Sequence, residues 1–129
     1  MNWLRRLLPG RNPAQSGAPI VLDIERRTDQ LQELENALDT LVTAMSAGDR
    51  MANPGWKARV AEYKRQSGTA YTLRRGGFTR EQLLDLAFEI RPVGDELPAD
   101  LAAVAELQVR VMNAAEALRE VLPSEQPAE

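Results

Sequence analysis

Residues 24–45 read IERRTDQLQELENALDTLVTAM, and apolar residues recur in this stretch at steps of three, four and seven positions. Such spacing places the apolar side chains on one side of an α-helix. The positions concerned are Ile24, Leu31, Leu34, Leu38, Leu41 and Met45. Because a helix side of this kind is stable only when another element covers it, the stretch predicts a second helix packed against the first.

A second stretch, residues 101–122, reads LAAVAELQVRVMNAAEALREVL and repeats the pattern at Leu101, Val104, Val111, Ala115, Leu118 and Leu122. Proline and glycine positions set the limits of two long helices at about 20–48 and 98–122. We expect these helices to cover each other as an antiparallel pair, with Leu34 and Leu118 buried. Gln108 stands where the pattern expects an apolar residue, either as a register-setting polar group or as the edge of the stripe.

Two shorter helices are expected between the long ones, at about 54–66 and 79–91. Asn53 is a good N-cap for the first, which Ser67-Gly68 should end. Thr79 and Gln82 form a capping box for the second, which ends before Pro92. The apolar sides expected are Trp56, Val60 and Tyr63 in the first, and Leu83, Leu84, Ala87 and Phe88 in the second.

The sequence therefore predicts an all-α fold, a small bundle of two long and two short helices. Residues 69–78 should be irregular, with a turn at Gly76-Gly77. A single helical domain is expected over 20–122. It follows a short amphipathic arm at 1–8 and a flexible linker at 9–19, PGRNPAQSGAP, and precedes a disordered tail at 123–129.

Composition excludes several kinds of chemistry. The 129 residues include no histidine and no cysteine, which removes the usual general base, the thiol nucleophile and the commonest zinc ligands. We expect no enzyme, no cofactor and no metal. Glu81, Asp85 and Glu89 recur every four residues and could hold a hard cation, but a solvent-exposed helix face accounts for them better.

Charge is segregated along the chain. Residues 50–80 hold eight basic residues and one acid, whereas the segments on either side are acidic and the net charge is −3. The candidate site for a protein partner or another anion is Lys57, Arg59, Lys64, Arg65, Arg74, Arg75, Gly76, Gly77 and Arg80. The alternative is a solvated face, or bases that pair with acids on the long helices. Aromatic residues among the bases would suit nucleic acid, but the acidic flanks make nucleic acid an unlikely partner.

The N-terminal arm is the second candidate site, through Trp3, Leu4, Arg5, Arg6, Leu7 and Leu8. Its apolar and basic residues suit a membrane surface or a partner, although a frayed end would show the same pattern. The sequence has no signal peptide and no membrane-spanning run, which predicts a cytoplasmic protein, with a membrane-peripheral location as the alternative. The function expected is a non-catalytic interaction or scaffold protein that binds a partner or itself. The alternative is a peripheral membrane, anion or nucleic-acid binder.

Overall fold

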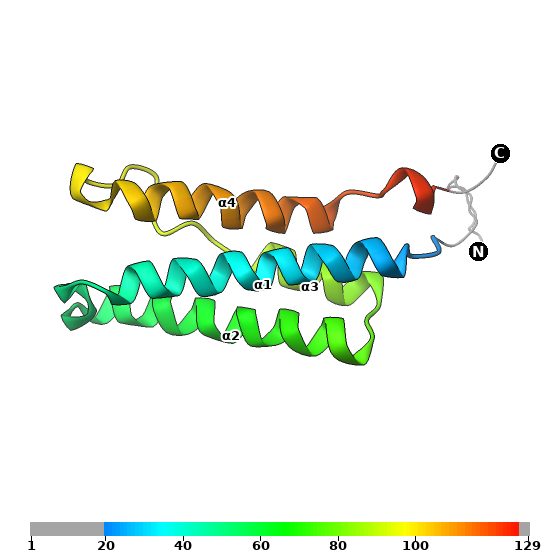
Figure 1. The fold of residues 1–129 in the computed structure, drawn as a ribbon, viewed down its shortest axis with the longest axis horizontal. Coiled ribbons are helices and arrows are strands. Elements are labelled where there is room, and N and C mark those ends of the chain that lie inside the picture. Colours follow the sequence, from blue (N-terminus) through cyan, green and yellow to red (C-terminus); the bar gives the residue numbers. More distant parts are fainter. Residues whose placement is uncertain (1–19, 127–129) are drawn as a thin grey trace, which may run out of the picture. The chain divides into compact units, whose positions relative to one another are not determined.

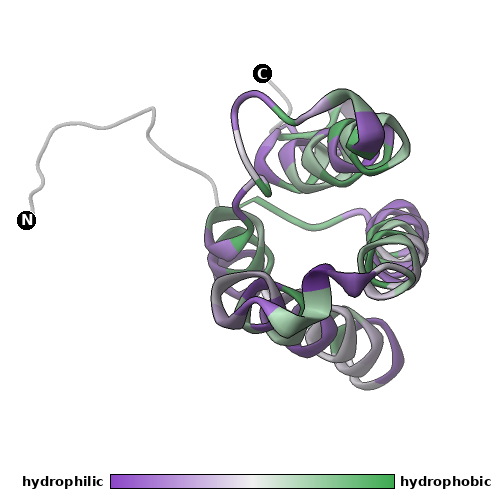
Figure 2. Ribbon diagram, turned by 90° about the vertical axis from the view of Figure 1, so that its left-hand side faces the viewer, coloured by the Kyte–Doolittle hydropathy of each residue, from purple (hydrophilic) through white to green (hydrophobic). Residues whose placement is uncertain are grey.

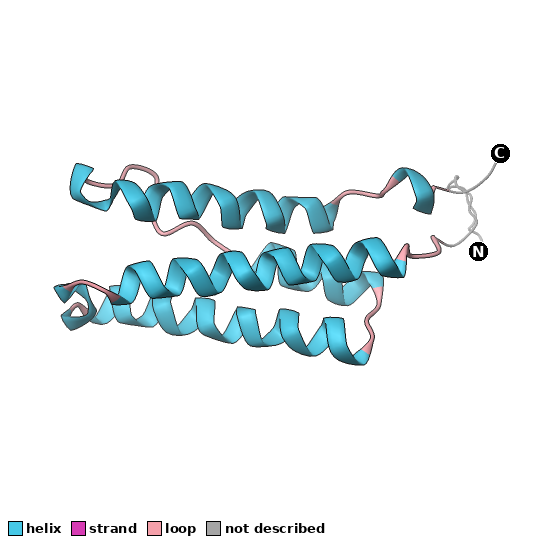
Figure 3. Cartoon of the chain, viewed as in Figure 1, coloured by secondary structure: helices cyan, strands magenta, loops and turns pink. Residues whose placement is uncertain are grey.

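A computed structural model describes residues 20–126 of the chain. Its four α-helices are α1 (Ile24–Ser46), α2 (Pro54–Gly76), α3 (Arg80–Glu89) and α4 (Ala102–Arg119) (Figure 1). Short 3₁₀ turns lie at Asp49–Ala52, Ala99–Leu101 and Pro123–Glu125. Every regular element in this part of the chain is helical, as Figure 3 shows, so the predicted all-α fold is confirmed. Ile24–Glu120 form one compact unit, and the described residues 20–23 and 121–126 belong to another.

The larger unit is organised around α1, which packs along both α2 and α4. Helix α3 packs against α4 and α2. The chain runs one way along α1 and α3 and the opposite way along α2 and α4 (Figure 1). Viewed nearly end-on, the four helices surround a common interior (Figure 2). The sequence predicted that one helix packs against α1, whereas in the structure two helices do so.

The apolar residues of the two long periodic stretches form much of the interior, together with residues of α2 and α3. Leu34 and Leu118 are both 0% exposed, which confirms the prediction that they are buried. Other buried members of these stretches are Leu31, Leu38, Leu41, Met45, Val104, Val111 and Ala115. Ile24 contradicts the pattern, since it is 56% exposed at the first position of α1.

Helix α2 is longer than predicted. It passes through Ser67 and Gly68 and ends only at Gly76, so the predicted end at residue 66 and the irregular segment 69–78 are wrong. A glycine inside a helix costs about 1 kcal/mol relative to alanine. Burial of the following turns offsets this cost, because Ala70 and Leu73 are in the core. The Ser67 hydroxyl also donates a 2.6 Å hydrogen bond to Asp39 on α1.

Helix α3 begins as predicted, with Thr79 and Gln82 forming the capping box. Its buried side is displaced from the predicted one. Phe88 is 64% exposed, while Leu86 is 2% exposed and takes the core position. The reason is that α3 packs through Leu83, Leu86 and Ala87, which rotates Phe88 outward.

The two long helices are shorter than the predicted 20–48 and 98–122. Residues Ala99–Leu101 form a 3₁₀ turn before α4 begins. Helix α4 ends at Arg119, where the buried Arg27 of α1 donates hydrogen bonds to the carbonyl groups of Ala117, Leu118 and Glu120. These are carbonyl groups that a helix end leaves without intrahelical partners, so Arg27 caps α4 from outside the helix.

An extended segment from Ile90 to Gly94 follows α3 and leads across the bundle toward α4 (Figure 1). Side chains of α2 hold its first half, because Tyr63 and Arg59 donate to the carbonyl groups of Arg91 and Pro92. Gln108 of α4 holds the second half. Its amide oxygen accepts from the N–H groups of Val93 (2.6 Å) and Gly94 (3.2 Å), and its amide nitrogen donates to the Gly94 carbonyl (3.1 Å).

The smaller unit is described at residues 20–23 and 121–126. The carboxylate of Glu125 accepts from the N–H groups of Asp23 (2.9 Å) and Leu122 (3.1 Å), and the Ser124 hydroxyl donates to the Asp23 carboxylate (2.6 Å). The predicted disordered tail is therefore wrong for Pro123–Glu125, which form a 3₁₀ turn. The predicted arm at 1–8 and linker at 9–19 lie outside the described residues.

Candidate functional site

The basic residues of α2 divide into two groups, and those of the first group pair with acidic residues of the bundle. Arg74 bonds the Glu35 carboxylate of α1 at 2.6 Å, and this hydrogen bond raises the pKa of Arg74. Arg65 lies 3.7 Å from Glu89 of α3. Arg59 pairs with Glu62 at 3.1 Å on its own helix. These guanidinium groups are engaged by the chain itself.

The second group forms one outward-facing row, which we call the basic face of α2. It consists of Lys57, Lys64, Tyr71 and Arg75, all exposed. At about 100° per residue, the four positions fall within an arc of roughly 40° on the helix. Ala61, Gly68 and Thr72 lie beside them, so small side chains separate the long ones. Periodicity alone could have found this row, but only if α2 had been predicted at its full length.

Tyr71 is held in a fixed position on this face. The guanidinium groups of Arg74 and Arg75 lie 5.1 and 5.4 Å from the centre of its ring, and Arg75 also donates a 3.2 Å hydrogen bond to its hydroxyl group. The ring is nevertheless 43% exposed. An exposed tyrosine held between arginines is the residue combination that is enriched at the energetic centres of protein interfaces.

The basic face has an uncompensated charge. Across residues 20–126, no carboxylate pairs with Lys57, Lys64 or Arg75, in contrast to Arg65 and Arg74. A row of three cations without an ion-pair partner among residues 20–126 produces a positive potential that attracts anionic groups.

The other predicted site residues do not come together as a single anion-binding site. Gly76 ends α2, and Gly77 turns the chain with φ +95°. The Thr79 hydroxyl accepts from the N–H of Gln82 (3.2 Å), and the Gln82 side chain accepts from the N–H of Thr79 (2.9 Å), so the capping box uses two N–H groups near the start of α3. Arg80 is half-buried, and its Nη1 atom has no hydrogen-bond partner among residues 20–126.

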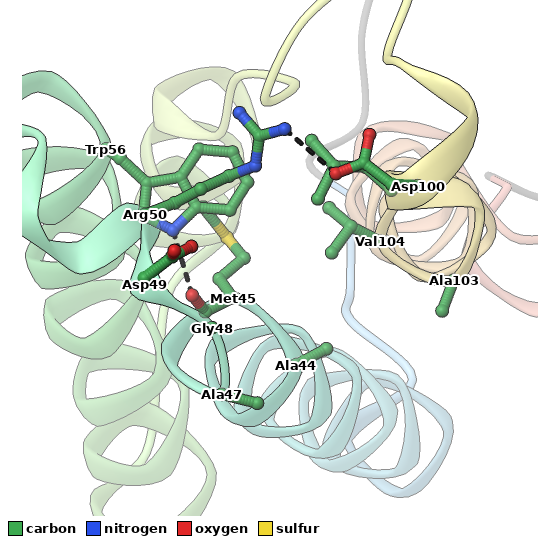
Figure 4. A pocket seen from close by; sticks show the side chains of 11 residues that line it. Ala44, Met45, Ala47, Gly48, Asp49, Arg50, Trp56, Asp100, Ala103 and Val104 are labelled. Carbon is green, nitrogen blue, oxygen red and sulfur yellow. Dashed lines mark hydrogen bonds and ion pairs between the residues drawn. The ribbon is translucent and has the colours of Figure 1, made fainter.

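A pocket of about 300 Å³ lies away from the basic face, where the end of α1 meets the start of α4 (Figure 4). Arg50 reaches across it, with its guanidinium group 5.8 Å from the centre of the Trp56 ring and 3.0 Å from the Asp100 carboxylate. The other lining residues are mainly apolar: Ala44, Met45, Ala47, Gly48, Asp49, Leu101, Ala103 and Val104. The sequence pattern did not predict this pocket because its walls come from three separate segments of the chain, residues 44–50, Trp56 and residues 100–104.

Other surfaces carry fewer signs of a site. Glu81, Asp85 and Glu89 are exposed on α3, and between residues 20 and 126 no group of three or more acids is placed to hold a metal ion. No helix of the part described has both the length and the apolar character needed to cross a bilayer. The candidate arm residues Trp3, Leu4, Arg5, Arg6, Leu7 and Leu8 lie outside this part of the chain.

Comparison with protein-family models, with curated proteins and with solved structures gave no match to this chain. The residues described above are therefore the basis for any statement about function.

Proposed function

We propose that this chain is a non-catalytic interaction protein that binds an acidic segment of a protein partner on the basic face of α2. The observation that carries the proposal is the outward row Lys57, Lys64, Tyr71 and Arg75, with which no acid of residues 20–126 pairs. Charge complementarity of this kind steers association and sets partner choice. The proposal includes a cytoplasmic location for both partners.

The form of the face favours a helical or extended peptide over a larger anion. Lys57, Lys64 and Tyr71 recur every seven residues, and the small residues Ala61 and Gly68 between them allow another backbone to approach closely. Tyr71 supplies apolar contact between Lys64 and Arg75 in the charged row. Such a surface suits a helix with acids on one side and an aliphatic residue placed to meet Tyr71.

Partner capture at a single position tests the proposal. A photo-reactive benzoylphenylalanine at position 71 is introduced in cells, with the same group at the exposed Asn36 of α1 as control. We expect an acidic segment of a protein to be cross-linked from position 71 and not from position 36. Cross-linking of nucleic acid or lipid, or of a second copy of the chain, from position 71 would contradict the proposal.

Charge reversal then tests the contact itself with the segment so identified. Each exposed pair contributes about 0.2–1 kcal/mol, so reversing two charges should cost about 1–3 kcal/mol, or roughly 5- to 150-fold in Kd. The variant is Lys57→Glu/Lys64→Glu. The control is Arg91→Glu/Arg119→Glu, which changes the net charge equally at exposed residues that contact Glu62 and the Phe88 ring, so its circular dichroism spectrum must match that of the unaltered chain. Equal weakening by both variants would mean that only overall charge matters, and the basic face would be excluded.

A further inference from the structure

The pocket at the junction of α1, α2 and α4 has the composition of a cation site, and this feature is independent of the basic face of α2. One wall is the Trp56 ring, and the rim carries the carboxylates of Asp49 and Asp100 (Figure 4). Apart from Arg50, the rest of the lining is apolar, from Ala44, Met45, Leu101, Val104 and neighbouring residues.

The end of α1 adds to the negative potential of this pocket. Helix α1 has no basic residue in its last turn, and Asp49 follows within three residues of its last residue, Ser46. The C-terminal end of a helix carries partial negative charge, which a nearby acid reinforces. Two carboxylates and a helix C-terminus therefore converge on one small space, with a single cation, Arg50, among its lining residues.

The Trp56 ring is fixed in the orientation that a cation needs. Its indole N–H donates a 2.8 Å hydrogen bond to the carbonyl group of Met45, the residue before the last of α1. Arg50 lies over the ring at 5.8 Å, so the ring already accepts a cation. Cation–π contacts of this kind are the usual way in which proteins recognise alkylated ammonium groups.

Arg50 itself is weakly held. Its side chain is 42% exposed and that of its partner Asp100 is 67% exposed. Exposed ion pairs of this kind are weak and screened by salt, so a competing cation can replace the guanidinium group. Because the guanidinium group is at the end of a long, flexible side chain, it can move into solvent without a change in the helices.

We propose that this pocket binds a small organic cation, an alkylammonium or guanidinium group, in the position that Arg50 occupies over Trp56. The cationic group takes the Trp56 face and the Asp100 carboxylate, while its alkyl part lies against Ala47, Ala103 and Val104. A volume of about 300 Å³ is at the lower limit of ligand pockets, which favours a small molecule or a single basic side chain.

Nuclear magnetic resonance of the full-length chain tests the proposal with n-butylammonium chloride as probe. In a Trp3→Phe background, Trp56 is the sole tryptophan, and its indole N–H gives one cross-peak. We expect a saturable shift of this peak with n-butylammonium, and none with n-butanol or butyrate at the same ionic strength. Equal binding of n-butanol would show a merely apolar pocket, and binding of butyrate would show an anion site; either result overturns the proposal.

Two variants separate the roles of the charged residues. Arg50→Met retains an apolar side chain of similar length and removes the competing cation, so binding of n-butylammonium should become about 2- to 5-fold tighter. Asp100→Asn alters an exposed carboxylate and should weaken binding by up to about 5-fold. If Arg50→Met binds n-butylammonium more weakly while its circular dichroism spectrum is unchanged, the proposal that the ligand displaces Arg50 is wrong.

Discussion

Replacement of Gln108 by leucine distinguishes the tertiary structure from the sequence pattern, because the two predict effects of opposite sign. The apolar repeat of residues 101–122 expects an aliphatic residue at position 108, so by that pattern Gln108→Leu should stabilise the fold. In the structure, the Gln108 side chain makes three hydrogen bonds to the backbone of Val93 and Gly94. Leucine would leave these partly buried backbone groups without partners.

The size of the effect follows from these contacts. Three hydrogen bonds at about 0.5–1.5 kcal/mol each amount to roughly 1.5–4.5 kcal/mol. The added apolar burial of leucine at a half-buried position returns about 1 kcal/mol. We therefore expect Gln108→Leu to lower the free energy of unfolding by about 1–3 kcal/mol.

Urea denaturation followed by circular dichroism measures this change. The matched control is Gln32→Leu, at an exposed position of α1, which should lie within about 0.5 kcal/mol of the unaltered chain. Hydrogen exchange should also accelerate at the amides of Val93 and Gly94 in the Gln108 variant. If Gln108→Leu is as stable as the unaltered chain, or more stable, then Gln108 does not hold the extended segment and its role is only that of a residue at the edge of the apolar stripe.

Two further changes test the turn after α2 and the buried tyrosine. Gly77→Ala should destabilise the chain by about 1–3 kcal/mol in urea denaturation, because φ +95° and ψ 158° suit only glycine. The control Gly76→Ala should be neutral or slightly stabilising. Equal effects of the two substitutions would show that alanine at position 77 causes no backbone strain. Burial raises the pKa of Tyr63 above its ordinary value of 10.0, so the phenol ionises at a lower pH in the unfolded chain than in the folded one. The free energy of unfolding should therefore be unaffected by Tyr63 ionisation below about pH 10, and should fall as the pH rises further through the folded pKa. Absorbance titration of Tyr71→Phe, in which Tyr63 is the sole tyrosine, should place the phenol transition above pH 10, and Tyr63→Phe should remove the associated loss of stability.

The length of α2 shows where local sequence signals were misleading. Ser67-Gly68 is a helix-stopping pair by propensity, yet the helix continues because Ala70 and Leu73 reach the core and Ser67 bonds Asp39. None of these partners is adjacent in sequence. Tertiary burial therefore overrode a local preference of about 1 kcal/mol, and with it changed the assignment of Tyr71 and Arg75 from an irregular segment to one helix face.

The candidate sites likewise could not be predicted in full from local sequence. Composition and charge segregation identified the basic segment, but they could not separate Arg74, which joins α2 to Glu35 of α1, from Arg75, which pairs with no acid in the described part of the chain. The two residues are adjacent in sequence and lie about 100° apart on the helix. Which of them meets an acid depends on how α2 is rotated against α1.

By itself, the sequence determined the helical class of the fold, the buried positions around Leu34 and Leu118, and the capping box at Thr79, because each depends on spacing within a few residues. Only the tertiary structure decided the end of α2, the outward turn of Phe88, the role of Gln108 and the pocket beside Trp56. Those features depend on groups that lie tens of residues apart and meet only when the helices pack.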